Sequence, residues 1–231
     1  MLIPGLERIR RGGRGASMAV YVALLRAVNL GGPTQLRMAA LAELFERAGW
    51  ADVQTLLQSG NVVFRGSSAD PSEVEPGLES LAARRLGLTT DFFVRTGAEW
   101  HAIASKNPFP RAAAQDPAHL VVTVLKDAPS PLEWKRLAES IRGREEVRGE
   151  DRHAYIVYPD GIGRSKLTAA AIERALGTRC TSRNWNTVRK LDEMATAEIP
   201  FRRRRVVAPK DTLVVGAARR SSNFPDRLRH S

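Results

Sequence analysis

The sequence predicts an α+β protein built from two similar halves, each a ferredoxin-like βαββαβ unit with an antiparallel sheet, followed by a C-terminal helix. Strand-like and helix-like patterns follow one another in the same order twice. The breaker-rich residues 107–117 separate the two runs, and the order repeats after roughly 95 to 100 residues. At 231 residues and 43% hydrophobic content, the chain is long enough to bury a core in each half.

The first half, residues 18–106, begins with an apolar strand and a Gly/Pro-containing loop. A helix follows, with Met38, Leu41, Leu44 and Phe45 at helical spacing, and it closes at Gly49. A turn at residues 58–60 joins the second and third strands, because glycine supplies the positive φ of a hairpin. The expected strands are residues 21–25, 53–57, 61–65 and 90–95, and the further helices are 71–86 and 98–105.

The second half, residues 118–196, repeats this order. The expected strands are residues 119–125, 145–147, 154–158 and 179–181, and the expected helices are 131–141 and 165–176. A final helix starts after Asn184. Each half should therefore pack two helices on one face of a four-stranded sheet.

The net charge of +11 comes mostly from the two ends of the chain. Residues 1–17 contribute +3, residues 197–231 contribute +6, and the body between them contributes +2. Such ends are typical of solvated, disordered tails, although their arginines could contact phosphates. We expect any nucleic-acid binding to depend on these tails. Met18 directly precedes the first strand and is the expected biological start, with a genuine disordered N-terminal arm as the alternative.

Composition excludes several classes of function. No run approaches the roughly 20 apolar residues that span a bilayer, and residues 1–17 lack the apolar core of a secretory signal, so we expect a cytoplasmic protein. The single cysteine, Cys180, cannot form an internal disulfide, and the four histidines lack metal-ligand spacing. Paired carboxylates and a Ser-His-Asp pattern are also missing. We expect no metal and no cofactor, and the sequence leaves the oligomeric state and any catalysis open.

Four segments resemble a known family. They are residues 21–32 (YVALLRAVNLGG), 57–64 (LQSGNVVF), 158–167 (YPDGIGRSKL) and 183–188 (RNWNTV). Together the segments are similar to the bacterial family called domain of unknown function 1697 (DUF1697). This resemblance implies an α+β fold with two ferredoxin-like portions, and it brings no activity, cofactor or catalytic residue. Members usually carry lysines after the Gly-Gly pair, whereas here only Arg37 is cationic between residues 33 and 37.

A first cluster of polar residues is expected where the first strand ends. In a βαββαβ unit the first two strands run parallel, so the loop after the first strand lies beside the turn between the second and third. Arginine, amide and hydroxyl groups there could donate hydrogen bonds to a phosphate or carboxylate. Alternatively, the glycines only turn the chain and the serine only closes a hairpin. The predicted ligand-binding residues are Arg26, Asn29, Gly31, Gly32, Gln58, Ser59 and Asn61.

A second cluster is expected after the third and fourth strands of the second half, which also run parallel. If Ser165 caps a helix, its free N–H groups and dipole would coincide with two cations and favour an anion. Alternatively, the cations are solvated and the serine only caps. Asn184 is an expected cap of the last helix, and Trp185 is expected in the core. The predicted ligand-binding residues are Gly163, Arg164, Ser165, Lys166, Arg183, Asn184 and Asn186.

Three functional hypotheses follow from these clusters. The first is a binding protein for a small anionic or nucleotide-like ligand held between the two clusters. The second is an enzyme acting on a phosphorylated or carboxylated metabolite, with Arg26, Arg164 and Lys166 as electrostatic stabilisers and no identifiable general base. The third is a nucleic-acid module, because Tyr155 and Tyr158 lie on the strand where ferredoxin-like RNA-binding domains carry stacking aromatic residues.

Overall fold

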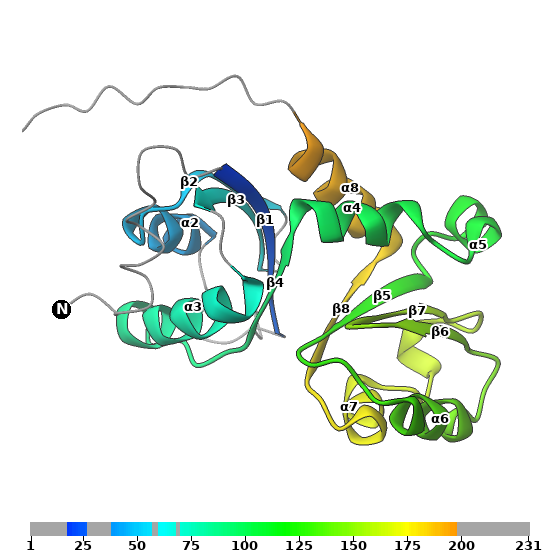
Figure 1. The fold of residues 1–231 in the computed structure, drawn as a ribbon. Coiled ribbons are helices and arrows are strands. Elements are labelled where there is room, and N and C mark those ends of the chain that lie inside the picture. The colour runs from blue at the N-terminus through cyan, green and yellow to red at the C-terminus, as the bar shows by residue number, and fades with distance from the viewer. Residues whose placement is uncertain (1–17, 27–37, 57–59, 68–69, 198–231) are drawn as a thin grey trace, which may run out of the picture. The chain divides into compact units, whose positions relative to one another are not determined.

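The computed structural model describes residues 18–26, 38–56, 60–67 and 70–197. It contains two four-stranded antiparallel sheets, with strand orders β2-β3-β1-β4 and β6-β7-β5-β8 (Figure 1). Both orders are those of a βαββαβ unit, in which the first strand is central and the last strand lies at an edge. The predicted α+β fold with duplicated ferredoxin-like halves is therefore confirmed.

The elements of the first half agree closely with the sequence pattern. They are β1 (Met18–Leu25), α2 (Met38–Arg47), β2 (Ala51–Leu56), β3 (Asn61–Ser67), α3 (Pro71–Leu86), β4 (Phe92–Thr96) and α4 (Gly97–Ser105). At the hairpin between β2 and β3, Gly60 has a φ of +67°. A Cβ atom there would lie 2.8 Å from Leu25 Cβ, so the turn requires glycine, as predicted.

The second half, together with the linker predicted before it, differs from expectation in one added helix, in the start of another helix and in the ends of two strands. Its elements are α5 (Pro110–Gln115), β5 (Leu120–Leu125), α6 (Pro131–Ser140), β6 (Glu146–Glu150), β7 (His153–Val157), the 3-10 turn η1 (Ile162–Arg164), α7 (Ala169–Leu176), β8 (Cys180–Asn184) and α8 (Trp185–Thr196). Residues 107–117, predicted as a linker, contain the short helix α5. The helix expected from Ser165 begins four residues later, at Ala169.

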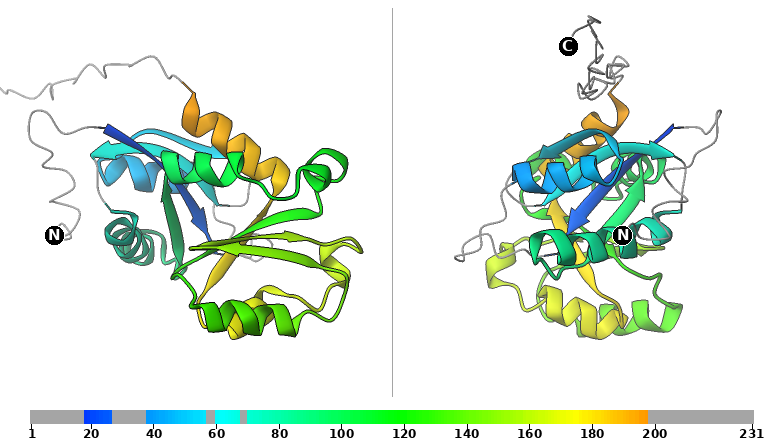
Figure 2. Two further views of the ribbon diagram at one scale, coloured as in Figure 1. Left: turned by 45° about the vertical axis from the view of Figure 1, so that its right-hand side comes forward. Right: turned by 90° about the vertical axis from the view of Figure 1, so that its left-hand side faces the viewer.

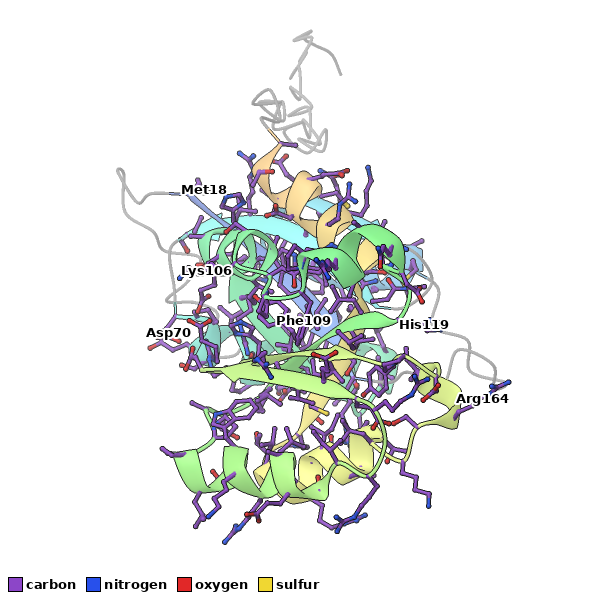
Figure 3. The ribbon with its side chains drawn as sticks, turned by 90° about the vertical axis from the view of Figure 1, so that its right-hand side faces the viewer. Met18, Asp70, Lys106, Phe109, His119 and Arg164 are labelled. Atoms are coloured by element: carbon purple, nitrogen blue, oxygen red, sulfur yellow. The ribbon has the colours of Figure 1, made fainter. Side chains whose placement is uncertain are left out.

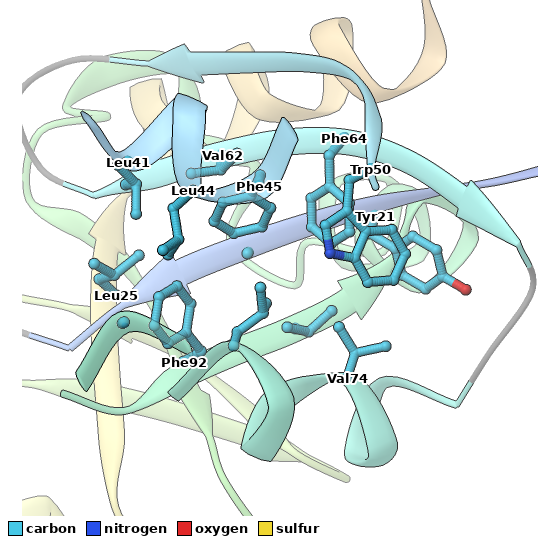
Figure 4. Packing of buried hydrophobic residues seen from close by; sticks show 14 residues of the cluster. Tyr21, Leu25, Leu41, Leu44, Phe45, Trp50, Val62, Phe64, Val74 and Phe92 are labelled. Carbon is cyan, nitrogen blue, oxygen red and sulfur yellow. The ribbon is translucent and has the colours of Figure 1, made fainter. Parts of the chain in front are cut away.

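The first-half core is rich in aromatic side chains (Figure 4). The Phe64 ring stacks on Tyr21 at 5.3 Å between centroids and meets Trp50 edge-on at 4.8 Å. Gly66 makes room for this arrangement, because a Cβ atom there would lie 2.2 Å from the Trp50 ring. This core fills the space between one face of the first sheet and helices α2 and α3.

A second core joins the two halves. The opposite face of the first sheet, the sheet of the second half, and helices α4 and α8 contribute buried side chains to one cluster. Helices α4 and α8 lie side by side (Figures 1 and 2). Trp100 of α4 is fully buried, and its Nε1 donates to the Val188 carbonyl of α8 at 3.2 Å. The halves therefore share a hydrophobic core, which determines how their two sheets face each other.

Candidate functional site

The two halves share the same hydrogen-bond register where their first strands end. The N–H of Leu25 donates to the β2–β3 turn, and the N–H of the next residue, Arg26, donates to the residue before β4. The second half repeats both bonds from Leu125 and Lys126, at 2.9 Å each. These bonds and the strand pairings make the following residues equivalent: Leu25 and Leu125, Arg26 and Lys126, Gly60 and Arg152, Asn61 and His153, Asp91 and Arg179, Phe92 and Cys180, Val94 and Ser182, Arg95 and Arg183.

Two arginines at equivalent positions reach across to the opposite half. Arg95 of β4 donates from Nη2 to the Leu125 carbonyl at 2.7 Å, and Arg183 of β8 donates from Nη2 to the Leu25 carbonyl at 3.0 Å. Each arginine satisfies the carbonyl at the end of the other half's first strand. Burial lowers the pKa of both guanidinium groups to about 10, so both stay charged at neutral pH.

Two glutamates also connect the halves, and both do so as acceptors of hydrogen bonds. Glu79 of α3 accepts the first N–H of β4 at 3.1 Å and pairs with Lys126 of the second half at 2.6 Å. Glu173 of α7 accepts the first N–H of β8 at 2.9 Å and pairs with Arg26 of the first half at 2.8 Å. Each glutamate thus fixes an edge strand in its own half and a cation from the other.

One pair of equivalent residues, Asp91 and Arg179, carries opposite charges and makes a direct contact between the halves. Arg179 Nη1 lies 2.6 Å from Asp91 Oδ1, and Arg26 Nη1 lies 3.6 Å from Asp91 Oδ2. If the two equivalent residues carried the same charge, this contact would be repulsive. The opposite charges of these two equivalent residues therefore make the contact between the halves attractive.

A cleft of about 800 Å³ lies between the halves, and several of these residues line it: Arg26, Glu79, Asp91, Arg179 and Arg183. We call it the interhalf cleft. Residues of β8 and the residues just before β4 line it. The side chains of Arg26 and Arg179 are 38% and 57% exposed, so solutes can reach both. Its lining includes Arg26, Asp91, Ala169, Arg179, Ser182 and Arg183.

The structure brings together three of the predicted ligand-binding residues. Arg26 and Arg183 line the interhalf cleft, and the Oδ1 atom of Asn61 accepts a hydrogen bond from Arg183 Nε at 2.5 Å. The N–H of Leu25 donates to the carbonyl of Gly60 at 2.8 Å, which confirms that the end of β1 lies beside the β2–β3 turn. Five further predicted residues lie outside the described part of the chain: Asn29, Gly31, Gly32, Gln58 and Ser59.

The prediction that Ser165 caps a helix is wrong. Thr168 is the N-cap of α7, and its hydroxyl accepts the N–H of Ala171 at 3.3 Å. Ser165 Oγ instead donates to the Glu145 carboxylate and accepts the N–H of Leu167 at 2.9 Å. Leu167 is buried in the core of the second half, and the helix begins only after Thr168.

The two cations of the predicted second cluster consequently precede α7 and do not lie in its first turn. Gly163 and Arg164 lie in η1, and both Arg164 and Lys166 are exposed. Figure 3 shows Arg164 projecting away from the body of the second half. Among the described residues, the lining of the interhalf cleft includes none of Gly163, Arg164, Ser165 and Lys166. These four residues are therefore separate from the described lining of the cleft, whereas Arg183 of the same predicted cluster belongs to it.

The remaining residues of the second cluster belong to the start of α8. Asn184 is its N-cap, as predicted, and its Oδ1 accepts the N–H of Thr187 at 3.0 Å. Trp185 is buried in the core between the halves, as expected. Asn186 is exposed, and neither it nor Asn184 lines the described part of the interhalf cleft.

Sequence reasoning missed several charged residues of this region, among them Asp91, Lys126, Glu173 and Arg179. Each lies at or near the end of a strand or helix whose existence was predicted. Their pairing becomes visible only when the two halves are aligned by hydrogen-bond register. An alignment that placed Arg26 on Lys126 and Glu79 on Glu173 would have been the available signal.

Several chemical roles find no support in the described residues. Burial raises the pKa of the Cys180 thiol to about 12, so this cysteine in the cleft lining is protonated at neutral pH and is no activated nucleophile. In the described part of the chain, no group of three or more His, Cys, Asp or Glu side chains could hold a metal ion. Helices long and apolar enough to cross a membrane are likewise absent from the described residues.

The aromatic residues proposed for nucleic-acid stacking are buried. The hydroxyl of Tyr155 donates to the Ile103 carbonyl at 2.8 Å, and that of Tyr158 donates to the Leu167 carbonyl at 3.1 Å. Both side chains are at most 4% exposed. They cannot stack on bases, so the prediction that they present an RNA-binding surface is wrong.

Comparisons with known proteins agree with this fold. A family model described as protein of unknown function (DUF1697) matches residues 18–155. A solved structure, that of the conserved bacterial protein SP0830 from Streptococcus pneumoniae, is similar with a TM-score of 0.62 at 19% identity. The similarity covers 78% of this chain and 99% of that one. A search of curated proteins gives no significant match.

Proposed function

The chain belongs to the DUF1697 family, and on that premise we propose that it is a cytoplasmic protein that binds a small anionic ligand in the interhalf cleft. The observation that carries this proposal is the convergence of Arg26, Arg179 and Arg183, contributed by both halves, on one cleft. Guanidinium groups are well matched to carboxylates and phosphates, because their planar donors can hold two oxygen atoms at once.

The geometry of the cleft fits a metabolite-sized ligand. Its volume of about 800 Å³ lies within the range of small-molecule sites. Two of the arginines already pair with carboxylates of the protein, which hold their side chains in place. Such preorganisation reduces the entropy lost when a ligand binds. Arg179 is the most exposed of these cations and would be the first to meet an incoming anion.

A ligand screen tests the proposal directly. Thermal shifts would be measured for the full chain with phosphate, nucleotides, sugar phosphates and small carboxylates, because a ligand that prefers the native state raises the melting temperature. Hydrogen bonds to charged groups contribute about 1.5–3 kcal/mol. Arg179→Ala and Arg26→Ala should therefore each weaken the binding of an active anion by about ten- to a hundredfold in titration calorimetry.

Arg47→Ala provides the matched control. Arg47 is an exposed arginine of α2 that pairs with Glu43 four residues earlier, away from the cleft lining. This variant should bind the anion as the unchanged protein does. Equal weakening in all three variants would indicate a nonspecific charge effect, and a screen without any anion that stabilises the protein would contradict the proposal.

The enzyme hypothesis gains no separate observation from the structure. The carboxylates nearest the arginines, Asp91 and Glu173, are both held in ion pairs, and the Cys180 thiol is protonated at neutral pH. Nucleic-acid binding through the tails concerns residues 1–17 and 198–231, which lie outside the described part of the chain. Binding of a small anion is therefore the function that the described residues support best.

A further inference from the structure

A buried carboxylate in the first half is held by donors that also occur at the equivalent position of the second half. It therefore indicates which chemical group that position could bind. Glu75 lies on α3, one turn before Glu79, and is 3% exposed. Its Oε1 accepts the N–H of Val94 at 2.8 Å and lies 3.7 Å from Arg95 Nη1, while its Oε2 pairs with Lys126 Nζ at 2.8 Å. One backbone N–H and two cations thus converge on a single carboxylate.

The second half keeps the corresponding donors but has no carboxylate at this position. The residue one turn before Glu173 on α7 is Ala169, so the position of Glu75 is occupied by a methyl group. The equivalent donors are the N–H of Ser182, Arg183 and Arg26. All three residues line the interhalf cleft, and so does Ala169.

The backbone of β8 presents a donor at this point. In an antiparallel pair, alternate residues direct their N–H groups away from the partner strand. Val94 does so at the edge of the first sheet, where Glu75 accepts its N–H. Ser182 has the same register in β8, which is also an edge strand. No group in the described part of the chain accepts the N–H of Ser182, and a backbone donor in a cleft favours an acceptor.

We propose that the interhalf cleft binds a carboxylate group of its ligand at the position that Glu75 occupies in the first half, held by Ser182 N–H, Arg26 and Arg183. This inference rests on the proposed function and narrows the ligand from an anion to a carboxylate. The remaining volume of the cleft holds the rest of the ligand.

The charges around the cleft favour one negative charge over two. Arg26 pairs with Glu173 as Lys126 pairs with Glu79. Lys126 has a second close carboxylate, Glu75, at 2.8 Å, whereas the second carboxylate near Arg26, that of Asp91, lies 3.6 Å away and also pairs with Arg179. A phosphate dianion would add a second charge and further oxygen atoms beside Glu173 and Asp91, where like charges repel. A carboxylate repeats the geometry that the first half already contains.

A titration of the unchanged full chain tests the inference without relying on any variant. Acetate, succinate, acetamide and inorganic phosphate would be added while the backbone amide resonance of Ser182 and the melting temperature are followed. The carboxylates should shift this resonance and raise the melting temperature, and the neutral acetamide should do neither. Phosphate that shifts the resonance in an Arg26-dependent way, with no effect of the carboxylates, would overturn this inference and leave the proposed function standing. If no anion shifts this resonance or raises the melting temperature, both this inference and the proposed function are wrong.

Replacement of Ala169 gives an independent test. Ala169→Glu places a carboxylate where Glu75 lies in the first half, and Ala169→Gln adds the same bulk without the charge. We expect the Glu variant to melt at a higher temperature than the Gln variant. It should also bind acetate more than about tenfold more weakly than the unchanged protein, since two negative charges at one position repel each other. A Glu variant that is less stable than the Gln variant, or that binds acetate normally, would overturn the proposal.

Discussion

At the scale of single residues, the duplication is visible in chemical roles more than in identities. Arg95 and Arg183 keep both residue type and role, and each bonds to the carbonyl that ends the opposite first strand. Other equivalent positions have diverged. Asp91 and Arg179 carry opposite charges and attract each other across the join. Divergence at such positions lets two similar halves form a complementary contact instead of a repulsive one.

His153, the residue equivalent to Asn61, should make stability depend on pH. Burial lowers the pKa of this imidazole below 6.5, and the cations Arg95 and Lys106 act in the same direction, against Glu150 and Asp151. The unfolded chain therefore binds more protons than the native protein as this group titrates, so stability rises with pH through that range and falls on acidification. In urea titrations between about pH 7 and pH 5, the unchanged protein should lose stability relative to His153→Asn.

The comparison with His153→Asn isolates this one group. The carboxylates whose pKa values are lowered, such as Asp70 and Asp160, are present in both proteins, so their effect cancels. Asparagine is the residue that the first half carries at the equivalent position, which makes it a suitable replacement. Parallel pH profiles for the two proteins would show that His153 does not titrate differently on folding.

The sequence predicted part of the candidate site because that part depends on strand topology alone. Arg26 and Asn61 had to lie at one end of the first sheet, since β1 and β2 run parallel and both end there. Arg183 was also predicted as a ligand-binding residue, but only as part of the cluster in the second half. Its contact with Asn61 depends on how the two sheets face each other. That orientation comes from the core around α4 and α8, whose packing no local pattern encodes.

At the scale of helices and strands, hydrophobic periodicity predicted which elements exist more accurately than it predicted the residues at which they begin and end. The sequence pattern predicted a start for α7 at Ser165, whereas Thr168, three residues later, is the N-cap in the structure. Leu167, between them, is buried in the core of the second half. The sequence of residues 107–117 favours a linker instead of the helix α5, because prolines such as Pro108 and Pro110 break most helices. Pro110 in fact occupies the first turn of the helix, where it is tolerated.

The start of α7 can be tested by comparing two sets of substitutions. Thr168→Ala removes the hydroxyl that caps α7 and should lower the free energy of unfolding by about 0.5–2 kcal/mol. The double substitution Arg164→Ala and Lys166→Ala should change it by less than about 0.5 kcal/mol, because both side chains are exposed and precede the helix. Urea denaturation measures both. A large loss in the double variant would mean that these cations have structural partners.

At the scale of the whole molecule, the core between the sheets makes the two halves one folding unit. Both sheets bury a face in the cluster around Trp100 and Trp185, and a half on its own would expose that face to water. Arg95, Arg183, Glu79 and Glu173 add charge-assisted hydrogen bonds that exist only when both halves are folded. Unfolding of one half should therefore expose enough apolar surface to unfold the other.

This coupling predicts that a substitution confined to one half weakens both. Leu41 is fully buried in the first-half core and belongs to no cluster of the second half. Leu41→Ala should cost about 2–5 kcal/mol, because it removes apolar contacts and leaves a cavity. If the halves unfold together, amide hydrogen exchange in β5 should show the same loss of opening free energy as exchange in β1. Ile172→Ala, in the outer core of the second half, provides the reciprocal variant and should weaken protection in β1 as much as in β5. Losses that stay within the substituted half would mean that each ferredoxin-like unit opens independently and that the interhalf cleft can open without global unfolding.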